Sequence, residues 1–177
     1  KMREAGLVMF SFSKKKNKSE QFSPEQFALL FLKYILERVQ KTETDSTLNE
    51  YDIQLLTGEL SCLLMFAVDF AIYDYLDRPK GNAIREAFYN HRIKLAKHKT
   101  NTTEAKKIID TQEDRIARYF TVLQKAEPEK WQEAIGKEFA RLSGYEKNII
   151  ISMYGTIEFI GILEIVQNVL HEHLQSP

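Results

Sequence analysis

Apolar residues along this chain recur at helical spacing. In several segments between residues 23 and 174 they return every three or four positions, which is the period of an α-helix that buries one face. Strict alternation of apolar and polar residues, the signature of a half-buried strand, is absent from the sequence. The pattern predicts an all-α fold.

Two segments, at about 48–78 and 146–174, are apolar around almost their whole circumference. A helix of this kind needs other helices to cover it on every side. The remaining segments carry a single apolar stripe each, so they are suited to surround the other two. The sequence therefore predicts a single-domain bundle of about six helices, with two apolar helices at its centre.

A membrane span is the alternative for the second of these segments, since roughly 20 apolar residues suffice to cross a bilayer. Glu158, Glu164, Gln167 and Asn168 interrupt the run from 149 to 170. An acid near the middle of a span costs about 2.5–3.5 kcal/mol on insertion scales. We therefore expect a buried core helix in preference to a transmembrane one.

Polar residues and prolines mark the expected helix starts. Ser23-Pro24-Glu25-Gln26 has the pattern of a capping box, and Thr47-Leu48-Asn49-Glu50 repeats it before the first central helix. Pro79 and Gly81 are expected to end that helix, with Asn82 capping the next one. Pro128 is expected to open a short helix, and the segment 100–103 to form a polar tip between two others.

The first 22 residues are expected to form a flexible basic arm ahead of a bundle domain at 23–177. Its lysines lie among serines, a composition that buries too little apolar surface to stay ordered alone. They are Lys14, Lys15, Lys16 and Lys18. Contact with an anionic surface, at about 1 kcal/mol per lysine, is a weaker interpretation than a solubilising tail. Residues 1–8 precede a plausible start at Met9 and are interpreted as a non-native or processed end.

Composition narrows the functional classes. The chain has 25 basic and 25 acidic residues, so net charge gives no argument for nucleic acid. Basic residues concentrate at 80–125 and acidic residues at 48–79 and 126–177. Cys62 is the only cysteine, which excludes an intramolecular disulfide and favours the cytoplasm.

Glu158 is the first candidate for chemistry, because Gly155 and Gly161 flank it by about one turn on each side. Such a notch leaves room beside a carboxylate for a ligand. The competing interpretation, which we favour, is that the glycines admit a neighbouring helix and Glu158 pairs with an arginine. Asp69 is its counterpart in the other central helix, with Tyr73 one turn further on.

Metal and cofactor sites are not predicted. Carboxylate-bridged metal bundles use a Glu-x-x-His pair on each of two helices, and this chain has no such pair. Phosphate-binding loops, dinucleotide fingerprints and nucleophile elbows are also missing. An enzyme is therefore less expected than a binding protein, and no cofactor is assigned.

A basic tip is predicted around the polar segment 100–103. Its six cations are Arg92, Lys94, Lys97, Lys99, Lys106 and Lys107. They lack the interleaved aromatic residues typical of single-stranded nucleic-acid sites, so a solvated face is favoured over phosphate contact.

Three functional classes follow, with a non-enzymatic helical binding or assembly protein ranked first. Self-association as a homodimer is expected because the outer helices carry more large side chains than one bundle need bury. These are Phe31, Tyr34, Phe88, Tyr89, Tyr119 and Phe120. An enzyme or ligand binder with a carboxylate site around Glu158 and Asp69 is the alternative. A membrane- or nucleic-acid-surface adaptor that uses the arm and the basic tip is the third.

Overall fold

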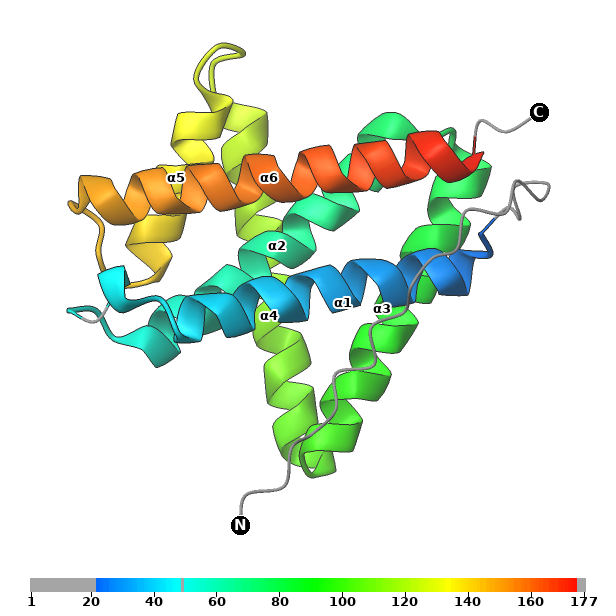
Figure 1. Ribbon diagram of the computed structural model, residues 1–177, viewed down its shortest axis with the longest axis horizontal. Helices are drawn as coiled ribbons and strands as arrows, with labels where there is room; N and C mark the ends of the chain where they lie inside the picture. The colour runs from blue at the N-terminus through cyan, green and yellow to red at the C-terminus, as the bar shows by residue number, and fades with distance from the viewer. Residues whose placement is uncertain (1–21, 49, 175–177) are drawn as a thin grey trace.

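The computed structural model describes residues 22–48 and 50–174. Within these ranges the chain forms six α-helices, one short 3-10 helix and no strand (Figure 1). The helices are α1 (Pro24–Glu43), α2 (Ile53–Tyr75), α3 (Arg78–Lys99), α4 (Thr102–Lys125), α5 (Trp131–Leu142) and α6 (Ile149–Leu174). The predicted all-α bundle is confirmed. Apart from Phe22, the predicted basic arm lies outside the described residues.

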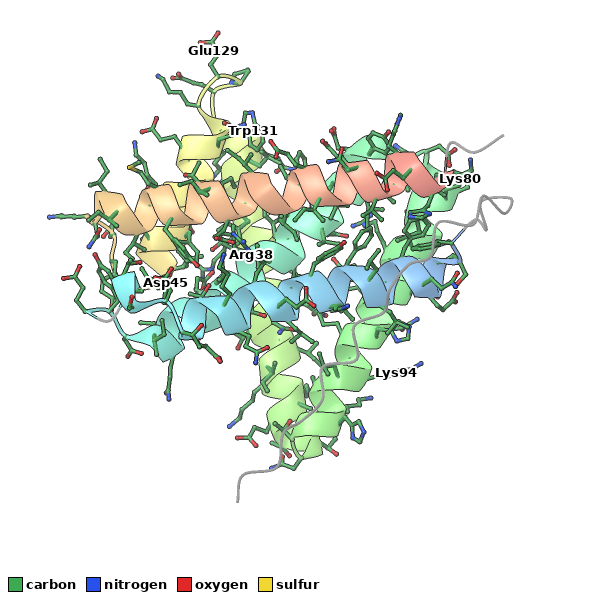
Figure 2. The ribbon with its side chains drawn as sticks, in the orientation of Figure 1. Arg38, Asp45, Lys80, Lys94, Glu129 and Trp131 are labelled. Atoms are coloured by element: carbon green, nitrogen blue, oxygen red, sulfur yellow. The ribbon has the colours of Figure 1, made fainter. Side chains whose placement is uncertain are left out.

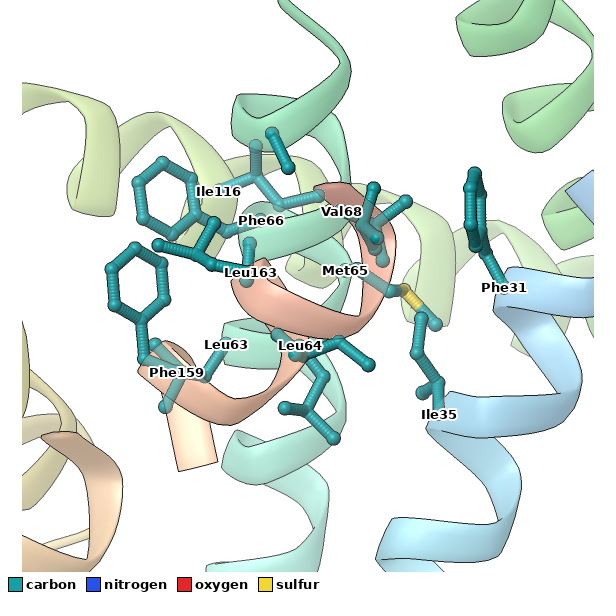
Figure 3. Packing of buried hydrophobic residues seen from close by; sticks show 14 of the residues in the cluster. Phe31, Ile35, Leu63, Leu64, Met65, Phe66, Val68, Ile116, Phe159 and Leu163 are labelled. Carbon is teal, nitrogen blue, oxygen red and sulfur yellow. The ribbon is translucent and has the colours of Figure 1, made fainter. Parts of the chain in front are cut away.

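Helix α2 is the centre of the bundle and packs against each of the other five helices. Every residue from 62 to 69 is buried. Phe66 stacks on Tyr119 of α4 and on Phe159 of α6, with ring centroids 5.4 and 5.5 Å apart. Figure 3 shows Leu63 to Val68 of α2 between side chains of α1, α4 and α6. The first predicted central helix is therefore a core helix.

Helices α1 and α6 run antiparallel on one side of α2 (Figure 1). Side-chain contacts join them near both ends. At one end Phe22 stacks on His173, with centroids 3.9 Å apart, and at the other the hydroxyls of Thr42 and Tyr154 lie 2.6 Å apart. This arrangement leaves the opposite side of α6 without a neighbouring helix.

Helix α6 differs from the prediction, because it is buried along one face only. Of its most apolar 18-residue window, 39% is buried, against 78% for the corresponding window of α2. An all-round apolar sequence does not require all-round burial, since the isoleucines of the outer face can remain exposed.

Three predicted helix starts are wrong, one of them at Pro128, which lies in a turn before α5 begins at Trp131. Helix α2 begins at Ile53, where the Asp52 side chain accepts from the backbone N–H groups of Gln54 and Leu55, while Thr47 and Leu48 lie in the 3-10 helix Ser46–Leu48. Helix α3 begins at Arg78 with Asp77 as its cap, so Pro79 lies in the first turn of a helix and does not interrupt one. The capping box at Ser23 is confirmed.

A tight reversal joins α5 to α6. Gly144 has φ +80°, a left-handed conformation that glycine adopts without steric cost. The Tyr145 N–H donates to the Ala140 carbonyl and the Gly144 N–H to the Arg141 carbonyl, the two hydrogen bonds of a Schellman motif. The reversal brings α5 back against the first half of α6.

Candidate functional site

Glu158 pairs with Arg38 across the seam between α1 and α6. Arg38 Nε donates to Glu158 Oε2 at 2.8 Å, and Arg38 Nη2 donates to the second carboxylate oxygen. The Glu158 side chain is 8% exposed and that of Arg38 is 37% exposed, so the pair reaches solvent through the arginine. The hydrogen bond to Glu158 raises the pKa of Arg38. In Figure 2, Arg38 lies between the two helices.

The two glycines around Glu158 do not form a common notch. A Cβ atom on Gly155 would lie 2.4 Å from the Phe139 Cδ1 atom, so the expected space is filled by α5. A Cβ atom on Gly161 would meet nothing within 4 Å. Gly155 therefore admits a neighbouring helix, whereas Gly161 adjoins open space.

Asp69 makes a second bidentate pair, with Arg85 of α3. Arg85 Nε donates to Asp69 Oδ1 at 2.5 Å and Arg85 Nη2 to Asp69 Oδ2 at 3.0 Å. Asp69 is 1% exposed, and this hydrogen bond raises the pKa of Arg85. Tyr73, its expected neighbour, is 59% exposed, with the Arg85 guanidinium 5.9 Å from its ring centroid. Asp69 thus joins α2 to α3.

A third buried acid, Glu59, was not predicted from the sequence. Tyr119 donates its hydroxyl hydrogen to Glu59 Oε1 at 2.7 Å, and Arg115 Nε lies 3.1 Å from Glu59 Oε2. Burial raises the pKa of Glu59 and raises that of Tyr119 well above 10. Glu59 therefore joins α2 to α4.

The three buried acids consequently have three different partners. Glu158 and Asp69, which the sequence suggested as one carboxylate site, each hold a separate arginine. Among the described residues no group of three or more histidine, cysteine, aspartate or glutamate side chains is placed to hold a metal ion. Each acid joins α2 or α6 to a neighbouring helix. The single carboxylate site predicted from Glu158 and Asp69 has no support from the geometry.

The predicted basic tip is only partly a surface feature. Lys94, Lys97, Lys106 and Lys107 are exposed at the end of the α3–α4 hairpin (Figure 2 labels Lys94). The side chain of Lys99 is outside the part of the structure that is described. Arg92 is 2% exposed and does not belong to this surface, because the adjoining helices enclose it.

Arg92 is incompletely paired despite its burial. Its Nη2 lies 3.3 Å from Glu113 Oε1, and Glu113 is itself 60% exposed. The Tyr89 ring centroid lies 4.6 Å from the guanidinium carbon. Arg92 Nε and Nη1 have no hydrogen-bond partner, and neither does the buried Oε1 of Gln112. Burial lowers the pKa of Arg92.

The outer side of α6 carries an exposed apolar face. We define the α6 face as Ile149, Ile150, Met153 and Ile157, which are 73, 59, 58 and 60% exposed. Spacings of three and four residues bring Ile150, Met153 and Ile157 to one side of the helix. The isoleucines of this face are of the same residue type as the buried isoleucines nearby, and only their position around the helix relative to Ile151 distinguishes them in the sequence.

The aromatic residues expected to form an association surface are buried or half-buried inside the bundle. Phe31, Phe88 and Tyr119 are each 0% exposed and belong to the core. The other three, Tyr34, Tyr89 and Phe120, are half-buried. These rings mainly fill the gaps between helices and do not form an exposed aromatic surface.

By length and hydropathy, α2 and α6 are each sufficient to cross a bilayer. The burial of α2 is typical of a soluble core helix, whereas only 39% of the residues in the apolar window of α6 are buried.

Comparison of the chain with protein-family models, with curated proteins and with solved structures gave no match. Function is therefore argued from the geometry of this chain.

Proposed function

We propose that this protein is a non-enzymatic helical assembly protein that self-associates through the α6 face. The observation that carries the proposal is the group of four aliphatic side chains on one helix, each more than half exposed. Single exposed aliphatic residues are normal on soluble proteins, but a contiguous group of large ones marks an interaction surface.

Gly161 supports a helix as the occupant. It lies one turn beyond Ile157 on the outer side of α6, where nothing fills the position of a Cβ. Positive φ is confined to Gly144 among the described residues, so the backbone does not require glycine at 161. Glycine in a helix interior costs about 1 kcal/mol relative to alanine. A helix from another molecule that approaches closely at this point would offset that cost.

A second copy of this chain fits the face by symmetry. In an antiparallel pair of α6 helices centred on Ile157, Met153 of each copy lies over Gly161 of the other, about 6 Å from the two-fold axis. The zero net charge of the chain adds no long-range repulsion between copies.

Sedimentation of the full chain over a wide concentration range tests the proposal. The wild type is expected to dimerise, and Ile157→Glu to remain monomeric, because a charge buried at a contact without a partner is costly. Leu29→Glu is the matched control, since Leu29 of α1 is also a large aliphatic residue and 55% exposed, but lies off α6. A wild type that stays monomeric at about 100 µM, or equal loss of dimer in both variants, would overturn the proposal.

The two uncrowded helical glycines give a second matched pair. Gly58 of α2 also has nothing within 4 Å of a Cβ, so Gly58→Ala should raise thermal stability and leave association unchanged. Gly161→Ala should raise the stability of the monomer but weaken the dimer. If both variants dimerise like the wild type, α6 does not approach its copy at Gly161.

A lipid bilayer is the other possible occupant of the α6 face. If the wild type binds lipid vesicles but does not dimerise, and Ile157→Glu abolishes that binding, the face is assigned to a bilayer.

A further inference from the structure

The cavity at Arg92 lies on the other side of the bundle from α6, among α1, α2, α3 and α4. It has a volume of about 210 Å³, below the roughly 300–1,000 Å³ of pockets for drug-sized ligands. Leu36 and Ile108, which both line it, are 43 and 36% exposed, so the cavity reaches the surface beside them. A small molecule therefore has a route in.

Two of the residues that line the cavity, Arg92 and Gln112, have buried polar atoms without a hydrogen-bond partner. Arg92 Nε and Nη1 are donors without an acceptor, and Gln112 Oε1 is an acceptor without a donor. Leaving such groups buried and unpaired destabilises the folded state, and a charged group does so more than a neutral one. Folded proteins pair nearly all buried polar atoms, so this set indicates a missing partner.

The walls around these groups are mainly aliphatic, from Leu32, Ile35, Met65 and Leu95 among others. A buried water needs two to four polar partners, and these walls offer few away from Arg92 and Gln112. A molecule with an apolar body and a polar head would contact the aliphatic walls and also pair with Arg92 and Gln112. Water would pair with the polar atoms but would not contact the aliphatic walls favourably.

The charge of the cavity lining indicates which polar head group a ligand would carry. Arg92 is the one charged residue among the described residues that line the cavity. A single guanidinium matches a monoanion, and its planar donors match the geometry of a carboxylate. A phosphate dianion would be left with unbalanced charge in a largely aliphatic cavity.

We infer that this cavity binds a small organic monocarboxylate with an apolar body, its carboxylate on Arg92 and a hydroxyl or N–H donor on Gln112. The site is independent of the proposed self-association, because none of its lining residues belongs to the α6 face.

Benzoate, 4-hydroxybenzoate and the neutral 4-hydroxybenzamide are suitable probes, followed by calorimetric titration and by the melting temperature of the full chain. Both carboxylates are expected to bind and to raise the melting temperature. The hydroxylated acid should bind more tightly, and the amide at least about tenfold more weakly, because it lacks the charge that faces Arg92. Failure of both acids to bind, or equal binding of the amide, would overturn the inference.

Arg92→Met separates a ligand site from a structural arginine. Replacing an incompletely paired buried charge by an apolar side chain should hold or raise the melting temperature without ligand, while benzoate binding falls at least about tenfold. Arg118→Met is the charge-matched control, since Arg118 is 48% exposed on α4 and should preserve both properties. A melting temperature that falls in Arg92→Met but not in Arg118→Met would show that Arg92 is structural.

Gln112→Leu tests the second contact. It should keep the fold and remove the advantage of 4-hydroxybenzoate over benzoate, because the acceptor for the hydroxyl is gone. A crystal structure grown with benzoate that shows only water at Arg92 Nε and Nη1 would overturn the inference.

Discussion

The ring of Phe139 occupies the space that a side chain at Gly155 would need. A Cβ there would lie 2.4 Å from Phe139 Cδ1 and 2.6 Å from Cγ, well inside van der Waals contact. Phe139 is fully buried, so its ring has little freedom to move away. The crossing of α5 over α6 therefore depends on the absence of a side chain at residue 155.

Gly155→Ala is expected to destabilise the fold by about 1–2 kcal/mol. Overpacking costs about 1–3 kcal/mol, and the roughly 1 kcal/mol that alanine gains in a helix offsets part of it. Urea unfolding measures the change, with Gly58→Ala as a control that should gain stability. Equal gains in both variants would mean that Phe139 can move aside at little cost.

Glu158→Gln is expected to lower the free energy of unfolding by about 1–2 kcal/mol, and Asp69→Asn by about 2–4 kcal/mol. Each substitution leaves an arginine without its counter-charge. Arg38 is 37% exposed and its charge is partly solvated, whereas Arg85 is 28% exposed and faces a fully buried acid. Chemical denaturation of both variants checks the order. The reverse order, or a gain of stability in Glu158→Gln, would contradict the structural role of these pairs.

Glu59 should make the fold relatively more stable at acidic pH. Burial raises its pKa above the ordinary value of 4.5, so the folded state holds the proton more tightly than the unfolded state. The stabilisation is complete below pH 4.5 and is lost as the pH rises through the folded-state pKa. Glu59→Gln cannot titrate, so the stability of the wild type relative to this variant should fall as the pH rises above 4.5 and through the folded-state pKa. A constant difference over that range would contradict the raised pKa.

Cys62 should be unreactive in the folded protein. Burial raises the pKa of its thiol to about 12, so about one molecule in 10⁴ carries the thiolate at pH 8. As the only cysteine, it gives an unambiguous signal with a chromogenic disulfide reagent. We expect slow labelling in buffer and complete labelling in denaturant. Rapid labelling in buffer would show that α2 opens locally.

Helical periodicity was sufficient to predict the class of fold and the number of helices. It did not fix their starts, because several polar residues in a row can each serve as a cap. Asp52 caps α2 in preference to Thr47, and Asp77 precedes Pro79 at the start of α3. Both choices depend on where the preceding helix docks, which is not a local property of the sequence.

The contacts of the candidate residues were less predictable. Arg38 and Glu158 are 120 positions apart, and no spacing rule connects residues on different helices. Arg92 resembled its neighbouring lysines by charge, yet packing of α3 against α4 enclosed it. The exposed isoleucines of α6 have the same composition as buried ones, so which side of the helix faces outward depends on the positions of α1, α2 and α5.

The central position of α2 has a consequence for synthesis on the ribosome. The chain is made from its N-terminus, so α2 is complete at Tyr75, while α6, which covers much of it, ends at Leu174. At about 5–20 residues per second, roughly 5–20 s pass between these two events. During that interval α2, the more deeply buried of the two most apolar helices, has only part of its final cover, so part of its apolar surface is exposed to water on the nascent chain.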